Sequence, residues 1–410
     1  MHVSKTRSQS LLSPAVMIAA LGYFVDIFDL LLFSIVRRPS LQSLGVPPDQ
    51  LVTTGLILHN TQMAGMLVGG ILWGILGDKR GRLSVLFGSI FLYSIANLAN
   101  AYVQSVGWYA VLRLIAGLGL AGELGAGITL VSECLPKEKR GYGTMIVATV
   151  GVTGAVVAGL LAEFFDWRTT YLIGGGLGLA LLFLRVGVAE SGIFSDLKEK
   201  AVTRGDFLSL FRDQAKLLRF VNCILIGAPI WFVIGTLIQF SPEFAAAFGV
   251  QGSITSGRAI AFCYTGLVLG DFASGFLSQK LRSRNRVVKL FLGLVGVGMI
   301  VFFTLNYGAQ ALTYYWVCLF LGFAVGYWAV FVTIAAEQFG SNLRATVATT
   351  VPNFVRSMVI PIALVFAPMS KAYGIVTAAI VVGTITLGIA FNSAFRLKES
   401  YGVELDYLEE

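Results

Sequence analysis

About a dozen apolar stretches, each close to the length of a membrane-spanning helix, run through most of the 410-residue chain. A helix needs ~20 apolar residues to cross a bilayer. Only 13% of the residues are charged, whereas a soluble domain carries about 25%. The chain therefore predicts an all-α integral membrane protein with twelve transmembrane helices. We place them at residues 12–36, 52–76, 84–104, 108–134, 142–165, 169–187, 218–240, 256–279, 287–306, 312–336, 345–369 and 373–395.

A short cationic turn between two apolar stretches occurs twice. Residues 74–82 read GILGDKRGR, and residues 275–284 carry a degraded copy, GFLSQKLRSR. A second pair, Glu133 and Arg140, recurs 204 residues later as Glu337 and Arg344. Such repetition predicts two pseudo-symmetric six-helix bundles with a site between them, a known transporter layout.

The repeat also divides the chain into predicted regions. The two bundles take residues 12–187 and 218–395, joined by a polar cytoplasmic linker at 188–217. A cytoplasmic N-terminus at 1–11 and a cytoplasmic tail at 396–410 complete the chain.

Lysine and arginine gather in the segments on one side of the predicted helices, including 74–82, 137–140 and the linker, and are sparse on the other side. This bias places both termini in the cytoplasm of a multi-pass cell-membrane protein. Small outer loops in so short a chain favour a bacterial inner membrane. The net charge of +8 is then mostly a topology signal and needs no nucleic-acid partner. We expect a monomer in the lipid bilayer.

The repeated turn and two further segments resemble the major facilitator superfamily of transporters. Residues 74–82 are similar to its signature between helices 2 and 3, and residues 113–119 (RLIAGLG) are similar to its fourth-helix motif. Gly151, Gly154 and Gly159 resemble its glycine-rich fifth helix, without the proline often found there. The resemblance implies the two-bundle major facilitator fold and transport by alternating access.

Four shorter segments resemble branches of the superfamily that carry metabolites. Residues 26–29 (DIFD) are similar to aromatic-acid/proton and phosphate/proton symporters, and residues 119–125 (GLAGELG) to metabolite/proton symporters. Glu190 and Ser191 match a pair shared with sugar and organic-ion transporters, and residues 353–361 resemble the helix in which organic-anion carriers keep an arginine. The resemblance implies proton-coupled symport of a small organic anion, with a carboxylate favoured. Phosphate, a sugar or polyol, and a zwitterionic osmolyte stay open as alternatives.

Several carboxylates lie inside predicted spans, where a charge costs ~3 kcal/mol or more. Asp26 and Asp29 are three residues apart, so they share a broad helix face about 60° wide. Burial disfavours the charged form of a carboxylate. Asp26, Asp29 and Glu123 are therefore candidate proton-coupling residues, although each could instead be a structural partner of an arginine.

Arg356 lies near the middle of its predicted span, at the depth of a transporter substrate site. Guanidinium stays charged and presents a fork of donors that matches a carboxylate or phosphate. Arg356 is thus the candidate substrate-binding cation, with a permanent salt bridge as the alternative. Trp231, Tyr264, Tyr327 and Trp328 are candidate aromatic contacts to a flat substrate, although such residues are more often core or lipid-facing.

A third group is assigned to gating or structure. Glu133, Arg140, Glu337 and Arg344 lie at the inner ends of their helices, where salt bridges would hold the outward-facing state. By the resemblance, Asp78 meets the inner end of helix 11, whose N-terminal dipole favours a negative charge. Arg113 is expected to be structural or to relay protons. The gating and structural residues are Gly74, Asp78, Gly81, Arg82, Arg113, Glu133, Arg140, Glu337 and Arg344.

No enzyme signature stands out in the sequence. There is no His/Cys/Asp cluster with metal-ligand spacing, no nucleophile–base pair and no phosphate-binding glycine loop after a strand. The four cysteines fall in or beside apolar stretches without ligand spacing. We therefore expect neither a metal nor a cofactor, and a small-molecule substrate and protons as the ligands.

Overall fold

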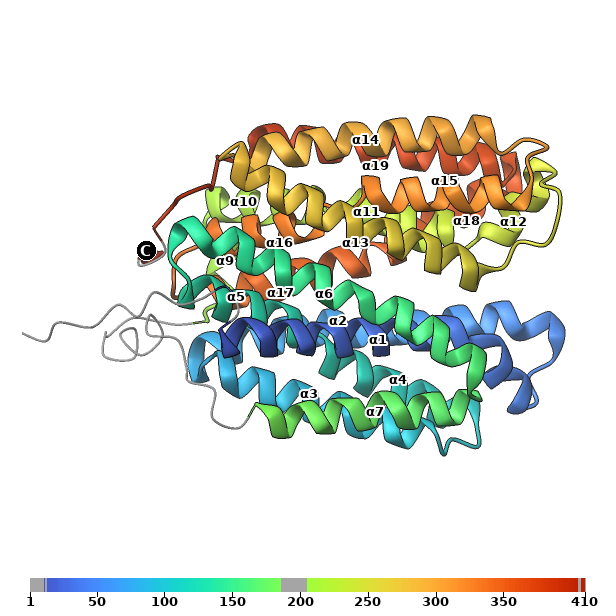
Figure 1. Cartoon of the computed structure of the whole chain (residues 1–410), viewed down its shortest axis with the longest axis horizontal. Helices are drawn as coiled ribbons and strands as arrows, with labels where there is room; N and C mark the ends of the chain where they lie inside the picture. The colour runs from blue at the N-terminus through green and yellow to red at the C-terminus, as the bar shows by residue number, and fades with distance from the viewer. Residues whose placement is uncertain (1–10, 12, 186–204, 405–406, 410) are drawn as a thin grey trace, which may run out of the picture.

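The computed structural model describes residues 11, 13–185, 205–404 and 407–409, which form helices that run nearly parallel in two adjacent bundles (Figure 1). In the first bundle, long apolar segments form helices that end at glycine or at short polar turns. Its helices are α1 (Pro14–Ser43), α2 (Leu51–Arg80), α3 (Arg82–Asn100), α4 (Val106–Leu120), α5 (Glu123–Cys134), α6 (Lys137–Phe164) and α7 (Trp167–Leu184), with a short 3-10 turn η1 (Pro48–Gln50).

The second bundle has more interruptions. After the short α9 (Ser209–Arg212), one span is built from three pieces, the last of them π-helical. The elements are α10 (Gln214–Leu225), α11 (Ala228–Phe232), η2 (Val233–Ile238), α12 (Ser241–Phe248), α13 (Ser256–Lys280), α14 (Arg284–Leu305), α15 (Ala311–Ala324), α16 (Trp328–Glu337), α17 (Arg344–Ser357), α18 (Val359–Tyr373) and α19 (Ile375–Arg396).

The predicted all-α architecture with twelve spans is confirmed. Eleven helical spans in the described part of the chain are long and apolar enough to cross a membrane. The remaining long helix, α2, has 30 residues and carries the polar side chains of His59, Asn60 and Gln62, which lower its hydropathy. It packs between α4 of its own bundle and α17 of the other.

Several predicted boundaries differ from the observed helices. The first span continues seven residues beyond its predicted end at residue 36, to Ser43, with Pro39 inside the helix. The predicted continuous spans 108–134, 218–240, 312–336 and 345–369 are each interrupted. A periodic apolar pattern does not show a break when the residues around it are small and apolar.

Two of these breaks occupy equivalent places in the two bundles. Ala121 and Gly122 separate α4 from α5, and residues 325–327 separate α15 from α16, about 204 residues later. At the first break the side chain of Asn353 in the other bundle donates to the carbonyl of Ala121 at 2.8 Å. At the second, the carboxylate of Asp271 accepts from the N–H of Ala329 at 3.0 Å. Each break thus has a polar partner for its freed backbone, as a helix end in a membrane requires.

The bundles contact each other through pairs of equivalent helices, α2 with α17 and α13 with α6. A Cβ atom on Gly74 would lie 2.8 Å from the Cα of Thr346. Only a residue without a side chain allows this approach of α2 to α17, as at small-residue interfaces in membranes. Gly275, the equivalent residue of α13, lies against the side chain of Met145 of α6.

Both bundles have their chain ends at one side, at the left of Figure 1, where α1 begins and α19 ends. We call this side the terminal face and the other side the opposite face. Of the predicted linker, residues 188–204 lie outside the described residues, as do Glu190 and Ser191 and most of the predicted N-terminus. The predicted domain boundaries remain predictions.

Candidate functional site

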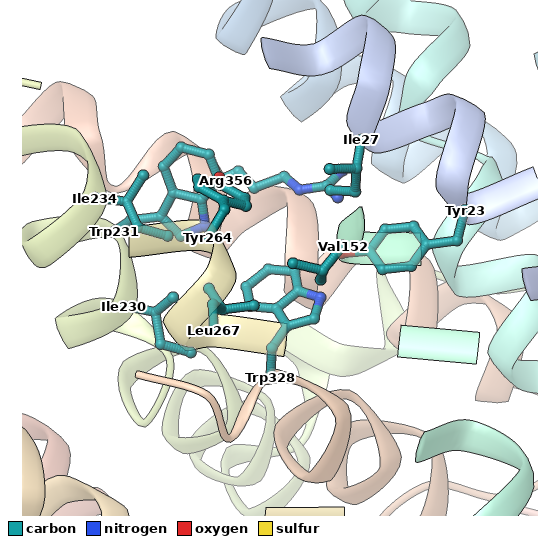
Figure 2. A pocket seen from close by; sticks show the side chains of 10 residues that line it. All are labelled: Tyr23, Ile27, Val152, Ile230, Trp231, Ile234, Tyr264, Leu267, Trp328 and Arg356. Atoms are coloured by element: carbon teal, nitrogen blue, oxygen red, sulfur yellow. The ribbon is translucent and has the colours of Figure 1, made fainter. Parts of the chain in front are cut away.

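A small cavity lies between the bundles near the middle of the molecule. It holds about 20 Å³, room for about one water molecule. Figure 2 shows Tyr23 and Ile27 extending from α1 toward the side chains of the second bundle. The lining residues are Tyr23, Ile27, Val152, Ile230, Trp231, Ile234, Tyr264, Leu267, Trp328 and Arg356.

Arg356 is the one charged side chain in this lining. It lies near the end of α17 and is 1% exposed. Its Nη2 atom is 3.3 Å from Oδ2 of Asp26 on α1, so the pair bridges the two bundles. The pairing is incomplete, because Nε of Arg356 and Oδ1 of Asp26 have no hydrogen-bond partner in the described structure. Arg356 therefore keeps donor capacity for a ligand.

Aromatic rings form much of the wall around this guanidinium. The ring of Trp328 has its centroid 5.6 Å from the Arg356 guanidinium carbon, within cation–π range. Trp231 and Tyr264 line the same cavity, and the indole N–H groups of both tryptophans have no partner within the described residues. The arrangement offers flat apolar surfaces, one fixed cation and unused donors.

Tyr327 lies outside the cavity, although the sequence predicts it as a substrate contact. Its hydroxyl donates to the carbonyl of Ile226 at 2.7 Å, across the break between α10 and α11. Tyr327 and Trp328 are adjacent where α16 begins, so their side chains point in different directions. Trp328 therefore lines the cavity, whereas Tyr327 lies in the interior of the second bundle.

Asp26 and Asp29 face different neighbours rather than one shared site. Asp26 contacts Arg356 at the bundle interface, whereas Asp29 lies against Gly174 of α7, inside the first bundle. Neither carboxylate oxygen of Asp29 has a hydrogen-bond partner in the described structure. Arg113 is the cation within electrostatic range of Asp29. A 60° difference around α1 is enough to separate the two carboxylates when the helix lies at an interface.

Arg113 is surrounded by the aromatic rings of Phe33, Tyr109 and Tyr171. It donates to Oδ1 of Asn97 at 2.8 Å, and its guanidinium carbon lies 5.0 Å from the ring centroid of Tyr171. It does not line the central cavity. This placement is compatible with the structural or relay role expected from the sequence.

Glu123 forms a buried ion pair with Arg185, at the end of α7. Arg185 also donates to the carbonyl of Leu86 at 2.6 Å. Gly22 of α1 packs directly on this pair. Glu123 is therefore placed in a closed contact within the first bundle and does not reach the cavity that contains Arg356.

The close packing of Gly174 against Asp29 leads to a direct prediction. We expect Gly174→Ala to lower the free energy of unfolding by about 1–3 kcal/mol, the usual cost of overpacking a filled core. The matched control is Gly176→Ala on the same helix, since nothing lies within 4 Å of a Cβ atom there. A thermal-shift assay on purified protein measures both. Equal melting temperatures for the two variants would contradict the packing of Asp29 described above.

A network of buried charges closes the terminal face, and we call it the gate network. Glu133 contacts Arg82 of its own bundle at 2.8 Å and Arg344 of the other bundle at 3.1 Å. The second bundle repeats this arrangement around Glu337, whose partners are Arg284 at 3.2 Å and Arg140 at 3.9 Å. Each glutamate thus has one arginine from each bundle. The gate network consists of Asp78, Arg82, Glu133, Arg140, Arg284, Glu337 and Arg344.

Asp78 connects the gate network to a helix end. Its two carboxylate oxygens accept from the N–H groups of Ala345 and Thr346 at 3.1 and 2.8 Å. These are orphan donors in the first turn of α17, where a negative charge is favoured. Gly81 has φ of 106° between α2 and α3, a left-handed region that favours glycine. It thereby brings Arg82 within 3.3 Å of Asp78.

Pockets open at both faces, and those at the terminal face hold about 380 and 430 Å³ at the ends of α6 and α13 and of α10 and α19. A pocket of about 530 Å³ lies between the ends of α1, α12 and α13. Arg37, Arg38 and Glu243 contribute its charges, and Ser256 contributes a hydroxyl. We call this pocket the vestibule. Buried ion pairs thus join the two bundles at the terminal face, and the vestibule lies between the bundles at the opposite face.

Sequence reasoning did not identify several residues around the centre. Tyr23 could have been found, because it lies one turn before Asp26 on the same face of α1. Arg284 stands in the degraded turn and could have been paired with Glu337 by analogy to Arg82. Asp271 could also have been found, because it is an acidic residue inside the predicted span 256–279. The ion pair of Glu123 with Arg185 depends on packing between distant helices and leaves no local signal.

Two relatives of known name cover most of the chain. A putative metabolite transport protein of Haemophilus influenzae is 27% identical over 391 residues, which are 92% of this chain and 90% of the relative. A putative niacin/nicotinamide transporter of Bacillus subtilis is 24% identical over 348 residues, which are 83% of this chain and 84% of the relative.

A solved structure and a family model agree with these relatives. The structure of the proton:xylose symporter XylE has a TM-score of 0.77 at 16% identity, covering 96% of this chain and 97% of that one. This likeness shows the fold. The model of the Major Facilitator Superfamily matches residues 19–363. The chain is therefore a multi-pass membrane transporter of the Major Facilitator Superfamily.

Proposed function

We propose that this protein is a secondary active transporter that carries a small organic anion, a carboxylate, by alternating access coupled to protons. One observation supports it above others: a buried arginine, Arg356, lines the central cavity with donor capacity that Asp26 does not fill. A charged side chain at this depth in a transporter is by default a functional candidate.

The geometry around Arg356 favours a carboxylate on a flat, partly apolar body. Asp26 accepts from only one guanidinium nitrogen, at 3.3 Å, whereas a free carboxylate can take two parallel hydrogen bonds from the guanidinium. Trp231, Tyr264 and Trp328 supply the apolar walls, as is usual in ligand pockets that use few polar groups for orientation. The Bacillus subtilis relative is named as a niacin/nicotinamide transporter, and niacin is a small aromatic acid.

Proton coupling follows from competition for Arg356. When Asp26 is ionised it occupies the guanidinium, and a substrate carboxylate would meet a like charge. When Asp26 binds a proton, its attraction to Arg356 weakens and the guanidinium can bind the anion. Proton and anion thus bind in cooperation, which is thermodynamically reciprocal. The cavity of about 20 Å³ must widen for this step.

Alternating access is supported by the contrast between the two faces. The vestibule opens at the opposite face, while the gate network closes the terminal face. The terminal face carries the cationic segments that the positive-inside rule assigns to the cytoplasm. We infer a conformation closed to the cytoplasm, in the inner membrane of a bacterium, with both termini cytoplasmic.

We expect Asp26→Asn to abolish accumulation driven by a pH gradient. The amide cannot exchange a proton, and it leaves Arg356 available for the anion, so exchange of labelled for unlabelled substrate should persist. Uptake into proteoliposomes with and without a pH gradient measures both activities. Gradient-driven accumulation equal to wild type would contradict the role of Asp26.

A sugar is the alternative substrate class, since one solved structure with a similar fold is a proton:xylose symporter. A thermal-shift screen against aromatic and aliphatic carboxylates, phosphate, sugars and osmolytes separates the classes. Stabilisation by a carboxylate, lost in Arg356→Ala, supports the proposal. Stabilisation by sugars alone would replace it.

A further inference from the structure

Asp271 is a carboxylate that the transport mechanism above does not use. It lies in α13, one turn after the cavity residue Leu267, and has no exposed surface. Its Oδ1 atom accepts from the N–H of Ala329 at 3.0 Å. Its Oδ2 atom has no hydrogen-bond partner in the part of the chain that the structure describes. One carboxyl oxygen therefore has a structural hydrogen bond, and the other has none in the described structure.

The first oxygen explains why an aspartate can stand here. α16 begins at Trp328, after the break at residues 325–327, and its first N–H groups need acceptors. Gly270 lies against Gly326 so closely that backbone meets backbone. This contact brings Asp271 to the start of α16, where it acts as an acceptor for the helix end. A neutral carboxylic acid can accept this hydrogen bond as well as a carboxylate can.

No lysine or arginine among the described residues forms an ion pair with the second oxygen. Asp26, Glu123 and Asp78 each have an arginine in contact, namely Arg356, Arg185 and Arg82. The charge of Arg113 acts on Asp29. Within the described structure, Asp271 is surrounded by buried groups and by the backbone N–H groups at the start of α16. An unpaired charge at this depth costs ~3 kcal/mol or more. The neutral acid avoids this cost.

The elements that pack against α13 determine which charged groups lie around Asp271. α6, α12, α14, α15, α16 and η2 contact α13. Arg140 of α6, Arg284 of α14 and Glu337 of α16 are engaged with one another in the gate network. The phenol of Tyr23 on α1 lies within electrostatic range of both Asp26 and Asp271. The remaining titratable residues with described side chains on these helices are Glu138, Lys139, Tyr142, Glu243, Arg258, Cys263, Tyr264, Lys280, Arg286, Lys289, Tyr314, Tyr315 and Cys318.

We propose that Asp271 is a second proton-binding site of this transporter, separate from Asp26 and occupied when the terminal face is closed. α13 packs against α6 of the other bundle, and Gly275, one turn nearer the terminal face, contacts Met145 there. Opening that face separates the two helices, hydrates Asp271 and allows the proton to leave. Trp328 begins α16 beside Asp271 and stands over Arg356, which connects this site to the substrate.

A second bound proton would change the net charge that moves in each cycle, provided that the transporter is the proton symporter proposed above. With Asp26 and Asp271 each carrying one proton, one monovalent anion crosses with two protons. The cycle then moves one net positive charge inward and responds to an inside-negative membrane potential. With Asp26 alone it would be electroneutral.

Proton occupancy can be tested without any transport. Infrared difference spectroscopy detects the carbonyl stretch of a protonated carboxylic acid. We expect Asp271→Asn to remove such a band at neutral pH, in protein reconstituted without sodium or substrate. The amide keeps the acceptor for Ala329; should it not fold, Asp271→Ser also supplies a helix-capping oxygen. Asp166→Asn is the matched control: Asp166 accepts from the N–H of Thr169 at the start of α7, and that hydrogen bond lowers its pKa, so it is ionised and contributes no band.

The possible outcomes separate the two proposals. Loss of the band only in Asp271→Asn supports the site, whether or not the protein carries anions. An unchanged spectrum overturns it, as does a band that appears in wild-type protein only after sodium is removed, since Asp271 would then hold a cation. In proteoliposomes, a potassium diffusion potential should stimulate anion uptake by wild type and not by Asp271→Asn, while a pH gradient still drives the variant. Equal stimulation of both by the potential would also contradict the second site.

Discussion

Arg356→Lys is expected to weaken binding of a carboxylate substrate about 10- to 100-fold, because a hydrogen bond to a charged group contributes ~1.5–3 kcal/mol. Lysine keeps the positive charge that Asp26 needs. It loses the planar fork that offers two parallel donors. The variant therefore separates the shape of the cation from its charge.

Isothermal titration with the carboxylate that most stabilises wild-type protein measures this loss. The matched control is Arg168→Lys. Arg168 donates to the backbone carbonyls of Ala101 and Val103 and does not line the central cavity. This variant should leave the affinity unchanged. An Arg356→Lys variant with wild-type affinity would show that the anion does not use the guanidinium fork, and that Arg356 serves Asp26 alone.

Much of the architecture could be predicted because membrane-spanning helices have strong local signals. Length, apolar content and the placement of lysine and arginine depend only on neighbouring residues. The repeated turn and the repeated Glu–Arg spacing also predicted where the bundles are related. Glu133 and Glu337 do occupy equivalent places, each between arginines of both bundles.

The residues that line the central cavity were harder to predict, because a side chain reaches the cavity only if its helix is rotated to face it. Asp26 and Asp29 belong to one helix turn, yet one contacts the other bundle and the other packs on α7. Tyr327 and Trp328 are neighbours, yet only Trp328 lines the cavity. Helix orientation is set by packing among helices far apart in sequence. The same packing brings Arg185 to Glu123 and Asp271 to the start of α16.

The gate network is expected to hold the terminal face closed. We expect the double variant Glu133→Gln, Glu337→Gln to favour the conformation that is open at the terminal face. Each glutamine leaves two arginines facing each other in a buried site, and breaking a buried ion pair costs about 3–5 kcal/mol. Opening hydrates these arginines and relieves that cost. Even 1.4 kcal/mol of relief would shift the population about tenfold.

A cysteine in the cavity reports this shift. Val152→Cys, in protein whose Cys134, Cys223, Cys263 and Cys318 are replaced by serine or alanine, places one thiol at the cavity wall. A membrane-impermeant maleimide added from the terminal face should modify it at least about tenfold faster in the double variant, in line with that population shift. The same reagent added from the opposite face should react more slowly than before, because the two openings exclude each other.

Glu243→Gln is the matched control, since this acid lines the vestibule and takes no part in the gate network. It should leave modification from the terminal face unchanged. If the double variant also leaves both rates unchanged, the ion pairs do not hold the terminal face closed. Closure would then rest on the glycine contacts of α2 with α17 and of α13 with α6, which the substitutions leave intact.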